Sequence, residues 1–180
     1  MKALLDTCVL YPTVMREVLL GVARAGMFTP MWSARILEEW SRAARKLGPE
    51  GEAQARSEVA MVRANWPDAE VQYGAGLEAR LWLPDPADIH VLAAAVAGSA
   101  DVIVTMNASD FPRNILAEEG LSRVAPDEFL FGFWQSHPEL VASVADAVRL
   151  EAERLSDQPW DMRKLMKKAR LPRLGKALSS

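Results

Sequence analysis

Cysteine and histidine are scarce in this sequence of 180 residues, which holds a single cysteine, Cys8, and two histidines, His90 and His137. One cysteine cannot form an internal disulfide and fits a reducing cytoplasm, so we interpret Cys8 as a small core residue rather than a reactive thiol. Zinc is disfavoured because zinc sites draw on clustered cysteine and histidine side chains. We expect His90 to be a packed or hydrogen-bonded helix residue, and His137, next to Pro138, to be structural.

Long hydrophobic runs are also missing. Asp6 interrupts the first apolar run and Asp101 precedes the second, so neither approaches the ~20 residues of a membrane-spanning helix. The stretch before Asp6 is too short for the apolar part of a signal peptide. Since half of the residues are nonetheless hydrophobic, we expect a folded protein with one good core and no membrane segment.

Charge is distributed unevenly along the chain. No acidic residue follows Asp161, whereas seven basic residues do: Arg163, Lys164, Lys167, Lys168, Arg170, Arg173 and Lys176. The net charge of the whole chain is −3, so the residues before this basic tail (residues 162–180) carry −10. Such asymmetry is typical of contact with nucleic acid or an acidic partner, although basic termini are as often simply solvated.

Short apolar segments alternate with longer amphipathic ones. Strands are predicted at residues 1–5, 27–32, 69–73, 102–105 and 121–124, and helices at residues 11–25, 33–46, 50–65, 77–81 and 86–97. Residues 127–169 are predicted to be helical, with an irregular tail after them. Because alternating strands and helices form parallel βα units, the predicted fold is a layered α/β domain with a central parallel sheet.

Four acidic side chains follow or open elements that we expect to be buried: Asp6, Glu39, Asp88 and Asp110. Asp6 ends the first predicted strand and Asp110 follows the strand at 102–105, so both are expected at the carboxyl edge of the sheet, where open α/β sheets place their chemistry. Two carboxylates roughly 5 Å apart repel by about 3 kcal/mol at an effective dielectric constant of about 20. Gathered carboxylates without cations therefore indicate a Mg²⁺ or Mn²⁺ site, since hard oxygen ligands favour such ions.

The helix predicted at 33–46 separates two adjacent glutamates. At about 100° per residue, its apolar residues form one arc, Glu38 falls opposite that arc, and Glu39 falls at its edge. We therefore interpret Glu38 as an ordinary surface charge and Glu39 as the candidate ligand.

The segments that contain these acids resemble motifs of the PIN domain family, in particular those of the VapC-like toxin ribonucleases of bacterial toxin–antitoxin pairs. The segments are Leu4-Leu5-Asp6-Thr7, Ile36-Leu37-Glu38-Glu39-Trp40, residues 85–95 and residues 103–112. The resemblance covers roughly residues 2–130, in the same order. The last two segments are the most specific, because each joins an acid to an apolar helix or strand at fixed spacing.

The resemblance implies a Mg²⁺- or Mn²⁺-dependent endoribonuclease with a three-layer α/β/α fold in residues 1–130 and a C-terminal helical extension in residues 131–180. It implies that Asp6, Glu39 and Asp88 surround the metal, with Asp110 as the fourth acid. It also implies a homodimer, an RNA substrate and a cognate antitoxin. We expect the basic tail to bring RNA to the acidic site without contributing to the fold; alternatively, its apolar residues pack on the domain or on an antitoxin.

The sequence departs from the commoner pattern of that family, which has an Asp two residues after the strand threonine. Asn107 stands at that position and Asp110 lies three residues further on, so either residue could complete the site. Thr105 is expected to hydrogen-bond an acid or a water held by the metal. Asp85 precedes a proline and is expected to form the turn before a helix, with a supporting place at the site as the alternative.

The same residues bear on two other classes of function. A phosphoacceptor signalling domain would need a lysine after its last strand, and no lysine lies between Lys46 and Lys164. A PIN-like module that binds RNA or a protein without cleaving stays open as the alternative function, because Asn107 replaces an acid.

Overall fold

The computed structural model describes residues 1–180, and the chain divides into two compact units. The first unit comprises residues 1–11 and 29–123, and the second comprises residues 12–28 and 124–180. None of the helices combines the length and the apolar character that a membrane span requires.

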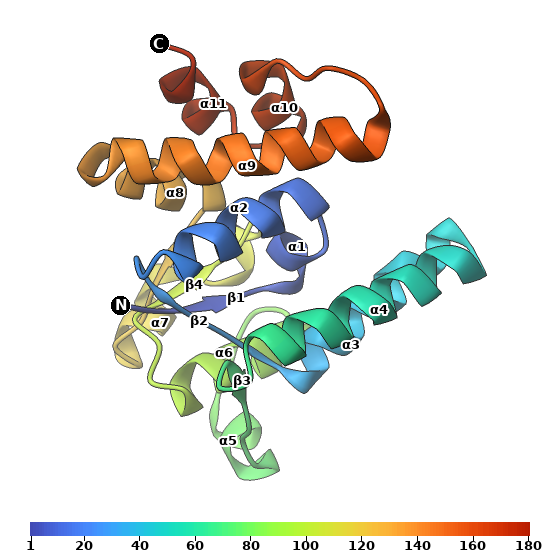
Figure 1. Ribbon diagram of the computed structural model, residues 1–180. Coiled ribbons are helices and arrows are strands. Elements are labelled where there is room, and N and C mark those ends of the chain that lie inside the picture. The colour runs from blue at the N-terminus through green and yellow to red at the C-terminus, as the bar shows by residue number, and fades with distance from the viewer. The chain divides into compact units, whose positions relative to one another are not determined.

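The first unit is built on a five-stranded sheet with the strand order β3-β2-β1-β4-β5 (Figure 1). The strands are β1 (Lys2–Leu5), β2 (Thr29–Ser33), β3 (Glu70–Val71), β4 (Val102–Val104) and β5 (Ser122–Val124). β1 pairs in parallel with β2 and β4, and β2 pairs in parallel with β3. The predicted α/β class, with a central parallel sheet and a helical C-terminal extension, is confirmed.

The register of β1 and β4 positions the candidate site. Leu5 pairs with Val104, and the backbone N–H of Asp6 donates to the carbonyl of Val104 at 3.2 Å. Both strands are apolar throughout their paired residues and buried, as expected for central strands of a parallel sheet. Asp6 and Thr105, the next residue of each strand, therefore emerge side by side at the carboxyl edge.

Six helices and three 3₁₀ turns complete the first unit. They are α1 (Thr7–Leu10), α3 (Ala34–Ala43), α4 (Pro49–Asn65), α5 (Ala75–Arg80), α6 (Ile89–Ala97), α7 (Arg113–Glu118), η1 (Ala44–Leu47), η2 (Pro86–Asp88) and η3 (Ala108–Asp110). Ser33 caps α3, as its residue type favours, because its hydroxyl accepts a hydrogen bond from the N–H of Ile36 at 3.2 Å. α1 and α7 were not predicted, because helices of four and six residues leave little periodicity to detect.

The second unit consists of five helices: α2 (Thr13–Arg24), α8 (Pro126–Ser136), α9 (Pro138–Ser156), α10 (Met162–Lys168) and α11 (Pro172–Leu178). α2 packs against α8 and α9, and α10 packs against α11. Phe28, Phe129 and Phe133 pack their rings at centroid distances of 4.9–5.8 Å. The helical stretch predicted for residues 127–169 is interrupted at His137 and again after Ser156, where Asp157 has a positive φ of 52°.

The basic tail is folded: α10 lies within the stretch predicted to be helical up to residue 169, whereas the residues after it form α11 instead of an irregular segment. Its last helix, α11, was not predicted, although Leu171 and Leu174 have helical spacing. Both leucines are fully buried, and Met166 of α10 is as well. The tail is therefore part of the second unit, which favours the alternative that its apolar residues pack on the fold.

The predicted boundary at residue 130 stays a prediction. α2 lies before that boundary and packs on α9, which lies after it. A fragment that ended at residue 130 would leave the apolar face of α2 without this cover.

Gly21 of α2 lies against Val144 of α9. A Cβ added at Gly21 would lie 2.5 Å from Cγ1 of Val144, too short for a non-bonded contact between carbons. We expect Gly21→Ala to lower the free energy of unfolding by about 1–3 kcal/mol, the usual cost of overpacking, in urea denaturation.

Gly132→Ala is the matched control, because a Cβ at Gly132 of α8 would meet nothing within 4 Å. This substitution should be neutral or stabilising by up to about 1 kcal/mol through helix propensity. Equal destabilisation by both substitutions would contradict the close approach of α2 and α9.

Candidate active site

Asp6 is a nearly buried carboxylate that connects three elements. It caps α1, with Oδ1 accepting the N–H of Thr7 at 2.8 Å, while Oδ2 accepts the hydroxyl of Thr105 beyond β4 at 2.8 Å. The Cys8 thiol donates to Oδ2 at 3.5 Å. Burial raises the pKa of Asp6, although the hydrogen bonds from Thr105 and Thr7 work in the opposite direction. The expected bond from Thr105 to an acid is confirmed.

Cys8 lies beside Asp6, a position that the sequence did not indicate. Its side chain is half-buried rather than in the core, and its sulfur accepts the N–H of Met106 at 3.3 Å. Burial and the neighbouring charge of Asp6 raise the pKa of the thiol to about 11. Cys8 therefore stays protonated at neutral pH, as expected for an unreactive thiol.

Glu39 differs from Asp6 because positive and hydrogen-bonding groups surround it. Oε1 lies 2.7 Å from Nε2 of His90 and 3.8 Å from Nε of Arg35, and Oε2 accepts the hydroxyl of Thr7 at 3.2 Å. Burial opposes its charge, yet His90, Thr7 and Arg35 together hold the pKa of Glu39 below its usual range. Glu39 therefore has basic neighbours in space, Arg35 and His90, although no basic residue stands beside it in the sequence.

His90 is a buried, hydrogen-bonded residue of α6, as expected. Its Nε2 meets Glu39, and its Nδ1 is buried without a hydrogen-bond partner. The Nε2–H therefore donates to Glu39, since Nε2 is the only ring nitrogen with an acceptor beside it. His137 lies between α8 and α9 and contacts only Ser136 among polar side chains, which agrees with a structural role.

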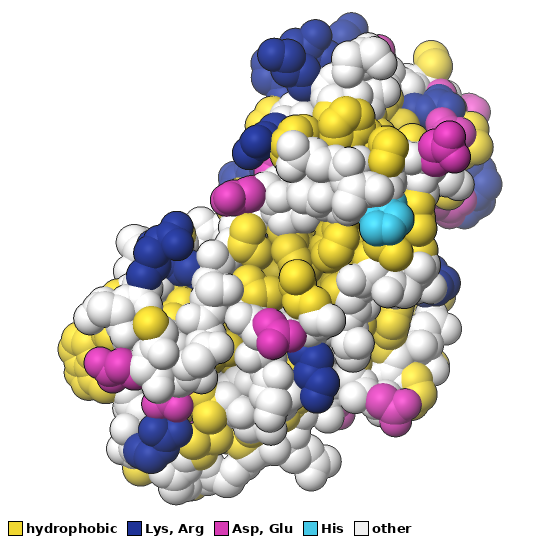
Figure 2. Space-filling view, turned by 90° about the vertical axis from the view of Figure 1, so that its left-hand side faces the viewer, with side chains coloured by type: hydrophobic (Ala, Val, Ile, Leu, Met, Phe, Trp, Pro, Cys, Tyr) yellow, Lys and Arg dark blue, Asp and Glu magenta, His cyan; other side chains and the backbone are white.

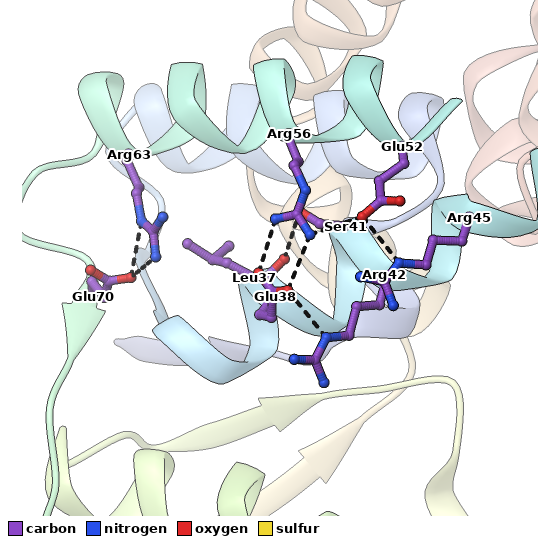
Figure 3. A network of polar contacts seen from close by, with 9 residues as sticks. All are labelled: Leu37, Glu38, Ser41, Arg42, Arg45, Glu52, Arg56, Arg63 and Glu70. Carbon is purple, nitrogen blue, oxygen red and sulfur yellow. Dashed lines mark hydrogen bonds and ion pairs between the residues drawn. The ribbon is translucent and has the colours of Figure 1, made fainter. Parts of the chain in front are cut away.

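Glu38 points away from this group, as the helical periodicity predicts. It forms ion pairs with Arg42 and Arg56, both at 3.1 Å, in a network of charges along α3 and α4 (Figure 3). A pocket of about 390 Å³ lies on the same side, lined by Leu37, Glu38, Ser41, Arg56, Val59, Ala60 and Arg63. Because none of the candidate ligands lines it, this pocket is separate from the candidate active site.

Asp88 lies at the end of η2, directly before α6, within range of the charges of other acids. The pKa of Asp88 is raised to about 6, first by partial burial and then by the nearby charges of Asp110, Asp6 and Asp85. None of Asp6, Asp88 and Asp110 forms an ion pair with lysine or arginine, whereas most surface acids on α3, α4 and α9 do. Asp85 accepts the N–H of Ala87 at 2.9 Å, so the turn role expected for it is confirmed.

The loop after β4 holds the remaining candidates, Asn107 and Asp110. Asn107 is exposed, and its N–H donates to the hydroxyl of Thr105 at 3.0 Å. Asp110 is half-buried at the end of η3 and acts on Asp88 through its charge. Asp110 therefore belongs with Asp88 by charge, whereas Asn107 is neutral and can contribute only its amide oxygen.

The acids lie within range of one another's charge, but their side chains do not form a ready metal cage. No group of three or more Asp, Glu, His or Cys side chains is arranged to hold an ion. The donor set itself fits a hard divalent cation, because it consists of carboxylates without paired lysine or arginine at Asp6, Asp88 and Asp110. The raised pKa values of Asp6 and Asp88 are those of carboxylates that lack a compensating positive charge.

The raised pKa of Asp88 makes stability depend on pH. A carboxyl with a native pKa near 6 and an ordinary value of 3.8 stabilises the fold when protonated, and this contribution is lost as the pH rises through about 6. We expect Asp88→Asn to raise the free energy of unfolding at pH 7.5 in EDTA, with little difference from the natural chain below pH 4. Urea denaturation at both pH values tests this.

Asp68→Asn serves as the control, since Asp68 is exposed and is not among the acids that act on Asp88. It should change stability little at either pH. A stability gain for Asp88→Asn that is equally large below pH 4 would show that repulsion between the acids is not its cause.

Comparison with known proteins gives the family. The family model described as PIN domain matches residues 2–109, which span β1 to η3 and include Asp6, Glu39 and Asp88. No curated protein and no solved structure matches the chain. PIN domains are generally nucleases and typically use divalent metal ions. With its parallel sheet, its acids at the carboxyl edge and a match over more than half of its length, the chain belongs to the PIN domain family.

Proposed function

We propose that this protein is a Mg²⁺- or Mn²⁺-dependent endoribonuclease that hydrolyses phosphodiester bonds in RNA. The observation that carries the proposal is that the charges of Asp110 and Asp6 act on Asp88, while no lysine or arginine forms an ion pair with any of these three carboxylates. Such a group costs free energy unless it is protonated or binds a cation. Its place beyond β1 and β4 is where parallel sheets present their chemistry.

The acidic residues of the site would have different roles in the reaction. Asp6 is held by Thr7 and Thr105, so its oxygens have little freedom to turn away from the site. Glu39 is oriented by His90 and stays charged, which suits it to orient a water or accept its proton. Asp88 and Asp110 would complete the ligand set. When bound, the divalent ion supplies a lowered pKa for its water and neutralises charge on the phosphate.

Further parts of the proposal rest on the resemblance of the motifs to VapC-like toxins. We propose that the protein is the toxin of a toxin–antitoxin pair, acts in the cytoplasm and forms a homodimer. A short reading frame for a DNA-binding protein directly upstream of this one would support the pairing. Purification of the two products as a complex would test it directly.

A second candidate function is an RNA- or protein-binding module that cleaves weakly or not at all. Two observations favour it: Asn107 stands where the commoner pattern has an acid, and the acidic side chains form no ready metal cage. In that case Mn²⁺ would not stimulate cleavage, although RNA or a protein partner would still bind.

Asp6→Asn tests the nuclease directly. The substitution keeps the size and the capping oxygen of Asp6 but removes its charge, so we expect Mn²⁺-dependent cleavage of RNA to be lost. The metal-free fold should persist, because the amide oxygen can still cap α1 and the amide nitrogen can donate to the hydroxyl of Thr105 from which Oδ2 accepts. Asp68→Asn removes a charge of equal size from an exposed position and should leave cleavage intact. Full activity of the Asp6 variant would refute the mechanism.

The adjacent glutamates provide a second test. Glu39→Gln should lower the cleavage rate by at least about two orders of magnitude, the scale usual for losing an acid–base group. Glu38→Gln should leave the rate nearly unchanged, because Glu38 pairs with Arg42 and Arg56 on the other side of α3. Rates of a single turnover at saturating Mn²⁺ separate the two variants. Equal losses would mean that Glu39 acts only through the charge of α3.

A further inference from the structure

The hairpin formed by α10 and α11 presents seven cations that no acid neutralises. Arg163, Lys164, Lys167, Lys168, Arg170, Arg173 and Lys176 are all exposed, and none lies within ion-pair distance of a carboxylate. Figure 2 shows Lys and Arg side chains gathered at the top of the molecule, at the height at which Figure 1 draws α10 and α11.

Basic residues elsewhere in the protein differ from those of the hairpin in their ion pairing. Most arginines before the tail form ion pairs with acids: Arg35, Arg42, Arg45, Arg56, Arg63, Arg80, Arg149 and Arg154. The charges of the hairpin are therefore not explained by the salt-bridge pattern that covers the rest of the surface. They leave a local positive field that an anionic partner can neutralise.

The hairpin is a folded platform and not a loose tail. On both helices the apolar residues share one arc and the cations lie opposite, at about 100° per residue. Leu165, Met166 and Leu174 are buried, and Gly175 permits the close approach of α11, since a Cβ there would lie 2.8 Å from Cβ of Met166. Asp127 of α8 anchors α11 by accepting the N–H groups of Arg173 and Leu174 at 2.8 and 2.9 Å. Charges on a fixed scaffold lose less entropy on binding than charges on a flexible chain.

Half-exposed aromatic rings accompany two of these cations. The guanidinium of Arg173 lies 4.0 Å from the ring centroid of Phe131, and Phe131 stacks with Trp134 at 5.6 Å and an interplanar angle of 22°. The ammonium of Lys168 lies 5.1 Å from the ring centroid of Trp160. Cationic groups beside stacked, accessible rings are the elements with which proteins bind single-stranded nucleic acid without sequence preference.

We propose that the α10–α11 hairpin, together with Phe131 and Trp134 of α8, is a binding surface for single-stranded RNA. The lysines and arginines would contact phosphates, and the aromatic pair would stack against a base. The identity of the nucleic acid as RNA rests on the proposed function, while the surface itself rests on the charges and rings of the second unit. An acidic protein would satisfy the charges, but it would leave the stacked rings without a role.

The charge part of the inference is tested by binding of a fluorescent oligouridylate of about 20 nucleotides to the full chain in EDTA. Lys164→Gln/Lys167→Gln/Lys176→Gln should weaken binding at least tenfold at about 0.1 M salt. It should also lower the slope of log affinity against log salt by about 2, since each phosphate contact on a single strand contributes about 0.7. Arg42→Gln/Arg45→Gln/Arg154→Gln removes as many charges from exposed, ion-paired positions and should leave the slope unchanged.

The stacking part is tested at Trp134 in the same assay. Trp134→Leu keeps apolar bulk but lacks an aromatic face, so we expect about tenfold weaker binding with an unchanged salt slope. Trp134→Tyr restores a face and should recover most of the affinity. Thermal unfolding of both variants separates loss of the fold from loss of binding: if Trp134→Leu does not fold, Trp134→Tyr must still bind like the natural chain for the inference to stand.

Two results would overturn the inference: equal salt slopes in the two triple variants, or polyglutamate of matched charge binding as tightly as oligouridylate. The second result would identify the surface as a site for an acidic protein. Cleavage is measured separately with Mn²⁺. If the chain binds oligouridylate in EDTA but does not cleave RNA with Mn²⁺, the proposed nuclease is refuted and the RNA-binding surface stands. If the chain cleaves RNA but the substitutions in the hairpin do not change its affinity for oligouridylate, the surface is refuted and the nuclease stands.

Discussion

The first unit depends on how a buried carboxylate without an ionic partner is accommodated. Asp6 is only 6% exposed, so its oxygens must receive hydrogen bonds from nearby donors or lose stability. Those donors come from two elements: Thr7 and Cys8 belong to α1, and Thr105 lies beyond β4. The bond from Thr105 joins the end of β1 to that of β4, and all three bonds orient the acid that we place at the centre of the chemistry.

The acids near this edge have opposite electrostatic surroundings. Glu39 has His90 and Arg35 beside it and keeps its charge, whereas burial and like charges raise the pKa values of Asp6 and Asp88. Environments that move titratable groups in opposite directions allow neighbouring carboxylates to take different roles. Here Glu39 would stay charged and orient a water molecule, whereas Asp6 and Asp88 would bind the divalent ion that relieves their repulsion.

Charge is also divided between the units. Along α3 and α4 of the first unit, exposed acids and bases neutralise one another in a continuous network, which contributes little net field (Figure 3). In the second unit the hairpin of α10 and α11 carries cations alone. A polyanionic substrate that met only the uncompensated acids would be repelled, so a separate cationic surface would be needed to offset that repulsion.

Local patterns in the sequence determined the strands, most of the longer helices and the outward direction of Glu38, because side-chain periodicity depends only on neighbouring residues. They also located Asp6 and Thr105 at the ends of two strands. Tertiary structure alone decided that His90 and Thr7 hold Glu39, that Cys8 lies against Asp6, and that the basic tail folds back into a hairpin. The first and the last of these depend on how separate elements pack, as in the bond between Thr7 and Glu39, which are 32 positions apart. Contacts at such separation follow from the whole arrangement of the chain, and no short segment encodes them.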